Sequence, residues 1–590
     1  MSQIRLTDLF SHIPELSHYV FVMAFFCIIL GLLWGRFKAM HVFGVVVLAL
    51  VITGFMGIKH LYASASNPSI LTVMALISLT SVLKKELNPG RLLSKVGNTP
   101  RGFLLFTTAF TAGLSAFVNN TPVVALLIPS VKAKAENRGW NPALFLMPLS
   151  FAAVAGGTMT LIGTSTNLVL NGMMLENGIT GFSFWDFLLP GLAVTTAVLL
   201  TTLLLAPLVL KKRLNSTDKS ISPLRSYTTE LSVLAEGNMT GLTVREAGLR
   251  NLNDLYLAEV YRDGLFISPV SPQEVLQAND TLFFTGALEH INRLLDLFPK
   301  GLTTLESKFQ VDARNDILEV IVPNNSDLIG KAVKQTDFRS RYDAVIVGVQ
   351  REGQSLRGKI GSLRLQAGDL LLLSVGSTFS LKNDSEISLI TLNQYARETK
   401  KKLGREKYFL PSIPIIIALG FFMQWTLLLT IGLVLLSGLL CGVSHAEKLK
   451  SDFNLELYAL LILSVAFGSA VVEGGHAQYF LEQLLLPESP TLGMVLLFAI
   501  TLVLTNFMTN VSAVAIAFPI AVAMMGHYQL DSVTVFLTLA FAASASFLTP
   551  ASYQTHLMVM GPGGYTNRDF LKLGLPVLLV YSAVALWILL

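Results

Sequence analysis

Two apolar stretches of this chain carry the same interruption, although they lie 390 residues apart. Each has a hydroxyl residue, then a polar dipeptide that ends in Asn, and then an apolar run that closes on Pro nine residues after that Asn. The stretches run from Ser115 to Pro129 and from Thr505 to Pro519. Paired interruptions of this kind favour discontinuous membrane helices that meet around a central binding site.

A second polar element follows each stretch at nearly the same distance. It reads Gly163-Thr-Ser-Thr-Asn167 in the first half and Ser552-Tyr-Gln-Thr-His556 in the second. The interval from the Asn of the first motif to the last residue of this element is 47 residues in the first half and 46 in the second. The chain therefore carries one pair of interrupted elements twice.

The composition is that of a polytopic α-helical membrane protein. Of 590 residues, 52% are hydrophobic and 14% are charged, against about 25% charged residues in soluble domains. The apolar runs recur near the roughly 20 residues that cross a lipid bilayer. Both cysteines, Cys27 and Cys441, lie within such runs, so the sequence predicts no disulfide framework. The net charge of +5 fits basic loops and requires no nucleic acid.

The motifs of soluble enzymes are missing from the sequence. It contains no P-loop, no Gly-x-Gly-x-x-Gly that opens a Rossmann unit, no His-Glu-x-x-His and no Cys-x-x-Cys. We therefore expect that the protein is not an enzyme.

The positive-inside rule gives a consistent path through the first half, residues 1–211. The segment 103–131 has basic residues at both ends, so it should enter the membrane and turn back as a re-entrant hairpin. Its turn holds Asn119-Asn120-Thr121, which we name the first tip. The predicted spans of this half are 18–35, 42–60, 68–83, 143–175 (broken at Gly163) and 184–210.

The second half, residues 405–590, repeats this scheme with the opposite orientation. Its hairpin, 492–525, contains no Lys or Arg and should enter from outside. The turn holds Thr509-Asn510-Val511, which we name the second tip. The predicted spans are 409–423, 426–442, 455–473, 533–560 (broken) and 571–590. The two halves therefore form inverted repeats.

A polar insert, about residues 212–405, separates the halves and should lie in the cytoplasm. It also looks duplicated, because Gly241 precedes Asp280 by 39 residues and Gly330 precedes Asp369 by the same interval. Short apolar runs and hairpin-turn signals at Arg262-Asp-Gly264 and Arg351-Glu-Gly353 indicate strands. We predict two small α+β modules, 225–300 and 305–390.

These features resemble the divalent anion:sodium symporter (DASS) family. The resemblance rests on the two Asn-bearing hairpins, the 163–167 segment and the turn Gly561-Pro-Gly-Gly-Tyr565. The similar branch carries two TrkA-C-like (RCK C-terminal) modules between its halves. The resemblance implies an elevator-type carrier and a homodimer. The modules could bind a small cytosolic ligand (nucleotide or ion) or only aid dimerisation and folding, and both alternatives stay open. Both tips depart from the family's Ser-Asn-Thr.

Interrupted helices leave carbonyl and N–H groups without partners in the membrane, and such groups bind ions. Polar residues in spans often only bond neighbouring helices, but their repetition at matched spacing favours a site. The resemblance implies Na+ at the first break through Ser115, Asn119, Asn120, Gly163 and Asn167. By the repeat, a second Na+ would use Thr505, Thr509, Asn510 and Ser552. The substrate would contact Asn120, Thr121, Thr164, Asn510, Val511 and Tyr553.

The identity of the anion is predicted from the side-chain groups that the two tips do not contain. Neither tip has Lys or Arg, and Val511 offers no hydroxyl to a second carboxylate. Sulfate, which the similar branch is associated with, is therefore preferred, and a C4-dicarboxylate comes next. The alternatives are a sodium-independent amino-acid/dicarboxylate exchanger and a regulated ion channel. In each case we expect a multi-pass protein of the cell inner (plasma) membrane.

Two ionisable residues near the predicted spans stay ambiguous in sequence. His556 could be a ligand, a proton-sensitive switch or a core imidazole with satisfied hydrogen bonds, and the last is favoured slightly. Glu473, beside two glycines near a span end, is expected to be an exposed interfacial carboxylate.

Overall fold

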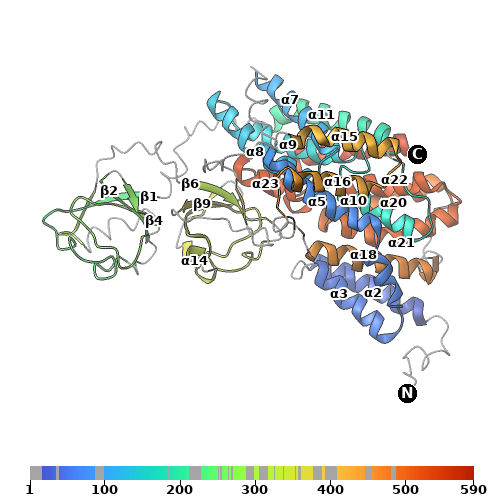
Figure 1. Cartoon of the computed structure of the whole chain (residues 1–590), viewed down its shortest axis with the longest axis horizontal. Helices are drawn as coiled ribbons and strands as arrows, with labels where there is room; N and C mark the ends of the chain where they lie inside the picture. Colours follow the sequence, from blue (N-terminus) through green and yellow to red (C-terminus); the bar gives the residue numbers. More distant parts are fainter. Residues whose placement is uncertain are drawn as a thin grey trace.

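Figure 1 shows a computed structural model in which a helical body carries two β-sheet units at one end. The basic residues at 36–38, 91–95, 211–213 and 400–402, on which the predicted orientation of the spans also depends, lie outside the residues that the structure describes. The described residues are 16–34, 39–86, 99–183, 185–210, 228–249, 252, 255–263, 265–267, 270–286, 298–304, 317–323, 326–336, 338–351, 354–356, 360–375, 389–391, 408–445, 449, 453, 455–476, 478–479 and 487–590.

The first half folds into helices close to the predicted spans. A turn that contains Asn119 joins two of them, α7 and α8, and the predicted span 143–175 is interrupted between Gly157 and Ser165, around Gly163. The helices are α2 (Leu16–Leu33), α3 (Ala39–Thr53), α4 (Lys59–Ala65), α5 (Pro68–Glu86), α7 (Pro100–Ser115), α8 (Asn120–Asn137), α9 (Ala143–Gly157), α10 (Ser165–Glu176) and α11 (Leu188–Val209).

The second half has helices in a corresponding order. The pair α20–α21 corresponds to α7–α8, the interrupted α22–α23 to α9–α10, and α24 to α11. The opposite orientation of the halves in the membrane stays a prediction. The elements are α15 (Phe409–Phe422), α16 (Leu427–Leu440), α18 (Leu455–Glu473), α20 (Pro490–Phe507), α21 (Asn510–Tyr528), α22 (Ser532–Ser544), the 3-10 turn η7 (Pro550–Ser552), α23 (Gln554–Gly563) and α24 (Asn567–Leu589).

Short polar residues fix where several of these helices begin. Thr99 accepts a hydrogen bond from the Gly102 amide before α7, and Pro100 occupies the first turn, where its missing N–H costs nothing. Asp531 caps α22 in the same way, through the Thr534 amide. These caps set the entry points of the helices that lead to the tips and the breaks.

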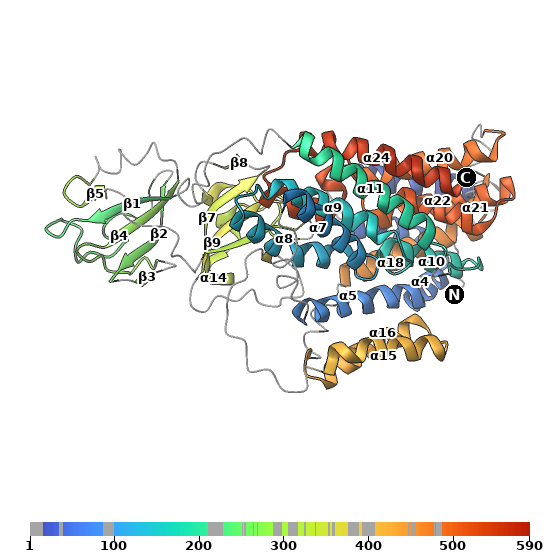
Figure 2. The ribbon, with the colours of Figure 1, turned by 90° about the horizontal axis from the view of Figure 1, so that it is seen from above.

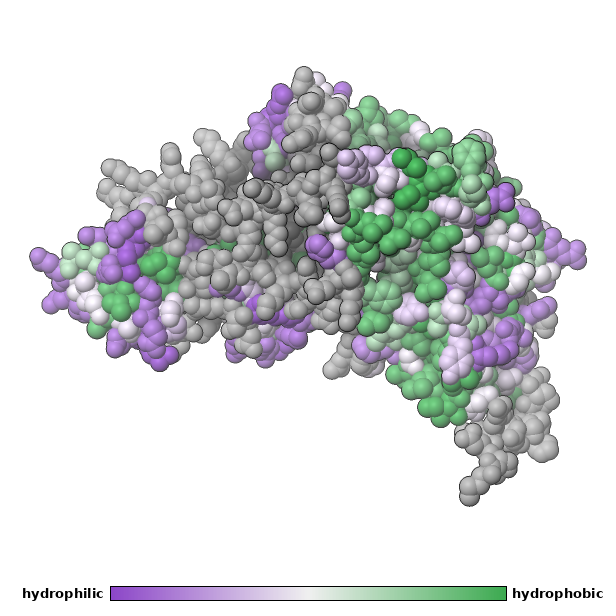
Figure 3. All heavy atoms as spheres, in the orientation of Figure 1, coloured by the Kyte–Doolittle hydropathy of each residue, from purple (hydrophilic) through white to green (hydrophobic). Residues whose placement is uncertain are grey.

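The surface of the helical body is that of a membrane protein. Among the described residues, six helices are long and apolar enough to cross a membrane, and further apolar helices are shorter. Large apolar side chains point outward, with Leu204 68%, Phe422 80% and Trp587 83% exposed. Figure 3 shows hydrophobic residues gathered over this body and hydrophilic ones over the outer β unit. The chain is therefore a multi-pass membrane protein, because such a surface is stable in lipid.

Each β unit contains a small antiparallel sheet (Figure 2). The first β unit has strands β1 (Thr228–Val233), β2 (Leu255–Arg262), β3 (Leu265–Ile267), β4 (Thr281–Gly286) and β5 (Leu302–Thr304), in the order β3-β2-β4-β1-β5. The second β unit has α14 (Phe338–Tyr342) and strands β6 (Ile317–Ile321), β7 (Ala344–Arg351), β8 (Gln354–Ser355), β9 (Leu370–Val375) and β10 (Ile390–Thr391), in the order β10-β6-β9-β7-β8.

Both hairpins that the turn signals indicate are present in the sheets. Strand β2 pairs with β3 and strand β7 pairs with β8, each in antiparallel register. The turn glycines Gly264 and Gly353 lie outside the described residues.

The two β units hold the same buried ion pair. The Arg262 guanidinium donates two hydrogen bonds of 2.8 Å to the Asp280 carboxylate, and Arg351 donates bonds of 2.7 and 2.8 Å to Asp369. The bond to Asp280 raises the pKa of Arg262 above its ordinary value. Partners in the second unit lie 89 residues after those in the first (351 − 262 and 369 − 280), as an internal duplication would produce.

Helices α7 and α9 approach closely at a glycine. A Cβ atom at Gly156 would lie 2.3 Å from the carbonyl oxygen of Ala112, well inside contact distance. The absence of a side chain therefore lets the broken helix pack directly against the helix that leads to the first tip.

We expect the Gly156→Ala variant to lose about 1–3 kcal/mol of stability, because the added methyl group must displace backbone. The measurement is the Tm of the purified protein in detergent. Gly113→Ala on the neighbouring helix is the control, since nothing lies within 4 Å of its Cβ position. A Gly156→Ala protein that melts with or above this control would contradict the close approach.

Candidate functional site

The first break, residues 158–164, folds back against the end of α7. The Thr160 hydroxyl donates to the Ala116 carbonyl, and the Asn167 side-chain amide donates to the Thr160 carbonyl at 3.1 Å. These two bonds fix the loop that separates α9 from α10. Asn167, which the sequence predicts as a ligand, thus also stabilises the loop of the first break.

Carbonyl oxygens converge on Gly163. A Cβ atom there would lie 2.5 Å from the Gly157 carbonyl oxygen and 2.8 Å from that of Ser115. The carbonyl oxygen of Ala116 would be 3.0 Å away. Only a residue without a side chain fits among these oxygens, and the same crowding makes a cradle of hard oxygen atoms around the break.

Three buried oxygens beside this cradle lack partners. Among the described residues, the Ser115 hydroxyl, the Asn120 side-chain oxygen and the Asn167 side-chain oxygen accept or donate no hydrogen bond. Each residue is buried, and the Asn120 oxygen would be 2.6 Å from a Cβ at Gly157. Buried polar atoms without partners cost about 1–3 kcal/mol each, so such a cluster suits a bound cation. Neutral oxygen ligands are those that hard cations prefer.

The second tip uses its polar groups differently. The Thr505 hydroxyl lies 2.5 Å from the Ala543 carbonyl and 2.9 Å from the Asn510 side-chain oxygen. Thr509 caps α21 by accepting from the Ser512 amide at 3.2 Å. The Ser552 hydroxyl lies 2.6 Å from the Thr549 carbonyl. Unlike the oxygens of the first break, these predicted ligands already have partners within the protein.

Three unpartnered oxygens around the second break, residues 545–553, belong to residues that the sequence reasoning missed. In the part of the chain that the structure describes, the Asn506 side-chain oxygen and the hydroxyls of Ser544 and Ser546 have no hydrogen-bond partner and are buried. The Asn506 amide donates to the Ala545 carbonyl at 3.2 Å, which places Asn506 beside both serines. The signal was the Ser-Ala-Ser run at residues 544–546, where an apolar span turns polar.

The first tip and the second break meet directly. The Asn120 side-chain amide donates to the Tyr553 hydroxyl at 2.7 Å, and Thr164 forms a hydrogen bond with the same hydroxyl. The Thr121 hydroxyl lies 3.5 Å from the side-chain oxygen of Gln554. Four of the six predicted substrate residues (Asn120, Thr121, Thr164 and Tyr553) therefore lie around one contact between the halves.

The other two predicted substrate residues lie at the start of α21. Asn510 is held within its own half by Thr505, and Val511 belongs to the large hydrophobic core of the helical body. Both are buried. Asn510 is thus tied to its own repeat, whereas Val511 lies in a core to which both repeats contribute.

His556 is a core imidazole with both ring nitrogens engaged. Its Nε2 lies 2.7 Å from the Ser546 carbonyl, which can only accept, so Nε2 carries the proton. Its Nδ1 lies 2.7 Å from the Ser150 hydroxyl. The favoured interpretation of the sequence agrees with these bonds. Glu473 forms a 2.8 Å salt bridge with Lys59 and is exposed, as expected of an interfacial carboxylate.

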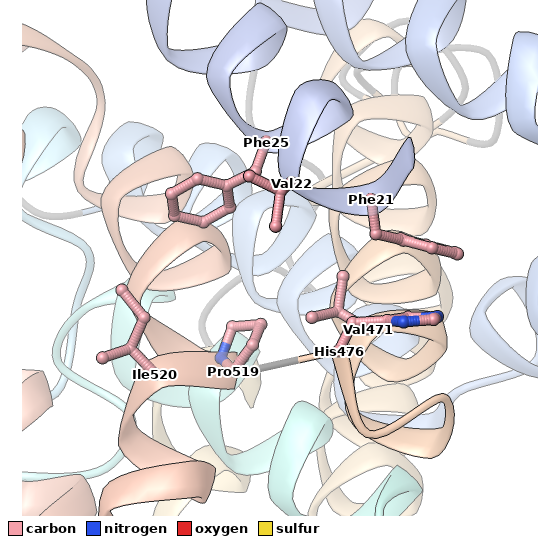
Figure 4. Close-up of a pocket in the computed structure, with 7 residues that line it drawn as sticks. All are labelled: Phe21, Val22, Phe25, Val471, His476, Pro519 and Ile520. Carbon is pink, nitrogen blue, oxygen red and sulfur yellow. The ribbon is translucent and has the colours of Figure 1, made fainter. Parts of the chain in front are cut away.

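An apolar pocket elsewhere in the body has a different character. Figure 4 shows side chains of α2, α18 and α21 around it, with the Phe21 ring stacked on His476. Burial, together with the neighbouring His18, lowers the pKa of His476 to about 4, so the ring is neutral at pH 7. The lining offers no charge to an anion. It consists of Phe21, Val22, Phe25, Val471, His476, Pro519 and Ile520.

A body of apolar helices whose interruptions gather polar groups between two repeats defines a membrane transporter, not an enzyme. The sequence matches the citrate transporter family (CitMHS) over residues 25–546, and the chain belongs to this family.

Two relatives match this chain over nearly their whole length, and a third matches it over part of its length. A candidate sulfur deprivation response regulator of Chlamydomonas reinhardtii is 28% identical over 569 residues, which cover 91% of this chain and 95% of the relative. An uncharacterized transporter of Synechocystis sp. is 26% identical over 559 residues, 91% of each chain. Sodium/sulfate cotransporter 1 of C. reinhardtii is 26% identical over 380 residues, 60% of this chain and 42% of the cotransporter.

These similarities confirm the resemblance at a coarser level than the sequence analysis gave it. The chain is a member of a citrate transporter family related to the divalent anion:sodium symporters, and it has sodium/sulfate cotransporters among its relatives. The identity of the β units as TrkA-C-like modules stays a prediction.

The Tyr553→Phe variant tests the contact between the halves. It removes the hydroxyl that accepts the Asn120 amide, which leaves a buried donor without this partner and should cost about 1–3 kcal/mol. We expect a lower Tm in detergent. Thr121→Val is the control, since the Thr121 contact of 3.5 Å is at the limit of a hydrogen bond and its loss should change the Tm little. Equal Tm values for the two variants would count against the contact.

Proposed function

We propose that the protein is a sodium-coupled secondary transporter of a divalent anion, with sulfate as the preferred substrate and a C4-dicarboxylate next. The observation that carries the proposal is the group of unpartnered buried oxygens at the first break, beside the contact between the first tip and Tyr553. The names of the C. reinhardtii cotransporters support both the ion and the anion.

The first sodium ion would bind at the first break. Ser115, Asn120 and Asn167 supply unpartnered side-chain oxygens, and the backbone around Asn119 and Gly163 supplies carbonyls. Sodium is a hard cation without strong geometric demands, so a mixed set of carbonyl, hydroxyl and amide oxygens suits it.

The second sodium ion would bind at the second break. The predicted ligands Thr505, Thr509, Asn510 and Ser552 surround this region, and their oxygens retain lone pairs even where the hydroxyl proton is already donated. Three further oxygens without partners complete the set, from Asn506, Ser544 and Ser546.

The anion would lie where helices begin. Helices α8 and α21 start at Asn120 and Asn510, α10 starts one residue after Thr164, and α23 starts one residue after Tyr553. Helix N-termini present free N–H groups and a partial positive charge to an anion. Four such ends can bind a compact tetrahedral anion without a Lys or Arg at either tip, and the bound sodium adds positive charge.

The remaining architectural predictions complete the proposal. The pairs α7–α8 and α20–α21 would be hairpins that enter from opposite sides, and a transport domain that bears both pairs would move against a dimerising scaffold domain as an elevator. The protein would be a homodimer of the inner (plasma) membrane with its β units in the cytoplasm, where they would take a small ligand or assist assembly.

Uptake of labelled sulfate into proteoliposomes should require an inward Na+ gradient and show a Hill slope above one for Na+. Asn120→Ala and Asn510→Ala should reduce uptake to background, because each removes an oxygen ligand and a helix-start contact. Asn238→Ala, an exposed residue of the first β unit, is the control and should transport normally. Undiminished uptake with K+ in place of Na+ would reject sodium coupling.

The Val511→Thr variant tests the choice of anion. The change is nearly isosteric and adds a hydroxyl at the start of α21. With sulfate as the substrate, it should leave sulfate competition within about twofold and strengthen competition by a dicarboxylate, which can use the hydroxyl. Competition of each anion against labelled substrate gives the answer. Weaker dicarboxylate competition in the variant would mean that Val511 already contacts the apolar part of a dicarboxylate.

A further inference from the structure

The second β unit is packed against the helical body. Figure 1 places β6 and β9 beside α8 and α23, and Figure 2 shows β9 beside α8. The Lys132 ammonium of α8 forms a 2.6 Å salt bridge with the Glu319 carboxylate of β6. The two side chains are 19% and 11% exposed, so the pair is largely withdrawn from water. Buried pairs of this kind hold a defined geometry, because separating the partners strands a charge.

Apolar packing between the same two parts accompanies this salt bridge. Ile321 of β6 and Leu370 of β9 belong to the same hydrophobic core as Leu557 and Met560 of α23. All four are buried. The sheet therefore shares the core of the membrane body and does not only touch its surface.

Two glycines bring the backbones of the two parts together. A Cβ atom at Gly561 of α23 would lie 2.9 Å from the Leu370 Cβ. A Cβ atom at Gly368, just before β9, would lie 3.1 Å from a methyl group of Leu557 and 3.9 Å from its Cβ. Larger residues at either position would push the sheet away from α23.

The first β unit lacks this apolar surface. The residues 89 positions before Ile321 and Leu370 are Ser232 and Thr281, so the duplicate has hydroxyl residues where the second unit has docking side chains. The pair Arg262–Asp280 shows that the two sheets are otherwise built alike. The apolar contact is thus a specialisation of one copy.

The two helices that hold the sheet are the ones that meet at the candidate site. Helix α8 begins at Asn120, and Lys132 lies 12 residues further on, about 18 Å along the helix. Helix α23 begins one residue after Tyr553, and Leu557 lies one turn further on. The sheet therefore bridges two helices whose starts are joined by the 2.7 Å bond between Asn120 and Tyr553.

We infer that the second β unit is a fixed part of the transport domain that bears both tips, docked on α8 and α23 throughout the transport cycle, and that it sets the spacing of their N-termini at the site. Glu319, Ile321 and Leu370 are accordingly positioning residues. A ligand or partner of the β units would act on transport through this contact. The inference rests on the proposed function, because the transport cycle belongs to that function. The docking of the second β unit on α8 and α23 can be measured whether or not the proposed function holds.

Zero-length carbodiimide cross-linking tests whether the contact persists. In the full-length protein in liposomes, Lys132 and Glu319 should form an amide cross-link that mass spectrometry detects. Its yield should agree within twofold with and without Na+ and sulfate. Glu319→Gln should abolish the cross-link, whereas Glu230→Gln, the corresponding change in the first unit, should leave it. A yield that falls several-fold when Na+ and sulfate are present would overturn the inference.

A disulfide tests whether transport tolerates permanent docking. With Cys27 and Cys441 replaced by Ser, the pair Gly368→Cys and Leu557→Cys has a Cβ separation of 3.9 Å, within the range of disulfides. The Leu557→Cys change removes the methyl group that crowds a Cβ at Gly368, and Asn279 carries a side chain in the same left-handed turn conformation in the first unit. The oxidised protein should keep at least half of its sulfate uptake. Uptake that stops on oxidation and returns on reduction would overturn the inference.

Substitution of the docking surface tests its positioning role. Leu370→Thr, which installs the residue of the first unit, should raise the KM for sulfate at least fivefold with a smaller change in maximal rate. Leu370→Ile, which keeps an apolar side chain, should leave the KM for sulfate near that of the unmodified protein. Thr281→Leu in the first unit should also leave the KM unchanged. An unchanged KM in Leu370→Thr would contradict positioning. If the unmodified protein takes up no sulfate at all, the proposed function fails, and the cross-link still decides the docking.

Discussion

The structure depends on a constraint of the apolar interior: a helix that stops inside it leaves backbone groups that water cannot reach. Both halves contain such stops, between Gly157 and Ser165 and between Ser544 and Gln554. The chain satisfies part of the demand internally, as with the Thr160 hydroxyl on the Ala116 carbonyl. Among the described residues, a few buried oxygens remain without partners, and the helix starts present N–H groups. These groups can form a site for small ions.

The contact between the halves is also the point from which two helices run to the second β unit. Asn120 lies at the first tip and Tyr553 at the end of the second break, so each repeat supplies one side of the same hydrogen bond. The helices that begin there run to the second β unit, where Lys132 meets Glu319. The site and the sheet are therefore two ends of the same pair of helices.

Apolar length and polar interruptions in the sequence predicted the helices and the position of the first break, because both signals are local. Comparison of the two halves assigned Asn120 and Tyr553 to one predicted substrate site, but it did not predict the hydrogen bond between them. The unpartnered oxygens of Asn506, Ser544 and Ser546 were missed, because Asn506 is brought to the Ser-Ala-Ser run only by the fold, through its bond to the Ala545 carbonyl. The salt bridge between Glu319 and Lys132 joins residues 187 positions apart, and the hydrophobic periodicity of a sequence does not predict such a long-range contact.

The Asn120 side chain is an amide with a donor end and an acceptor end, and the two ends differ little in size. Because its nitrogen is engaged by the Tyr553 hydroxyl, its oxygen is the end that stays without a partner. Rotating the amide by half a turn would exchange the two ends and present hydrogens in place of the oxygen. In the structure, the contact between the repeats thus leaves the acceptor end of Asn120 without a partner, and this end suits a cation and not an anion.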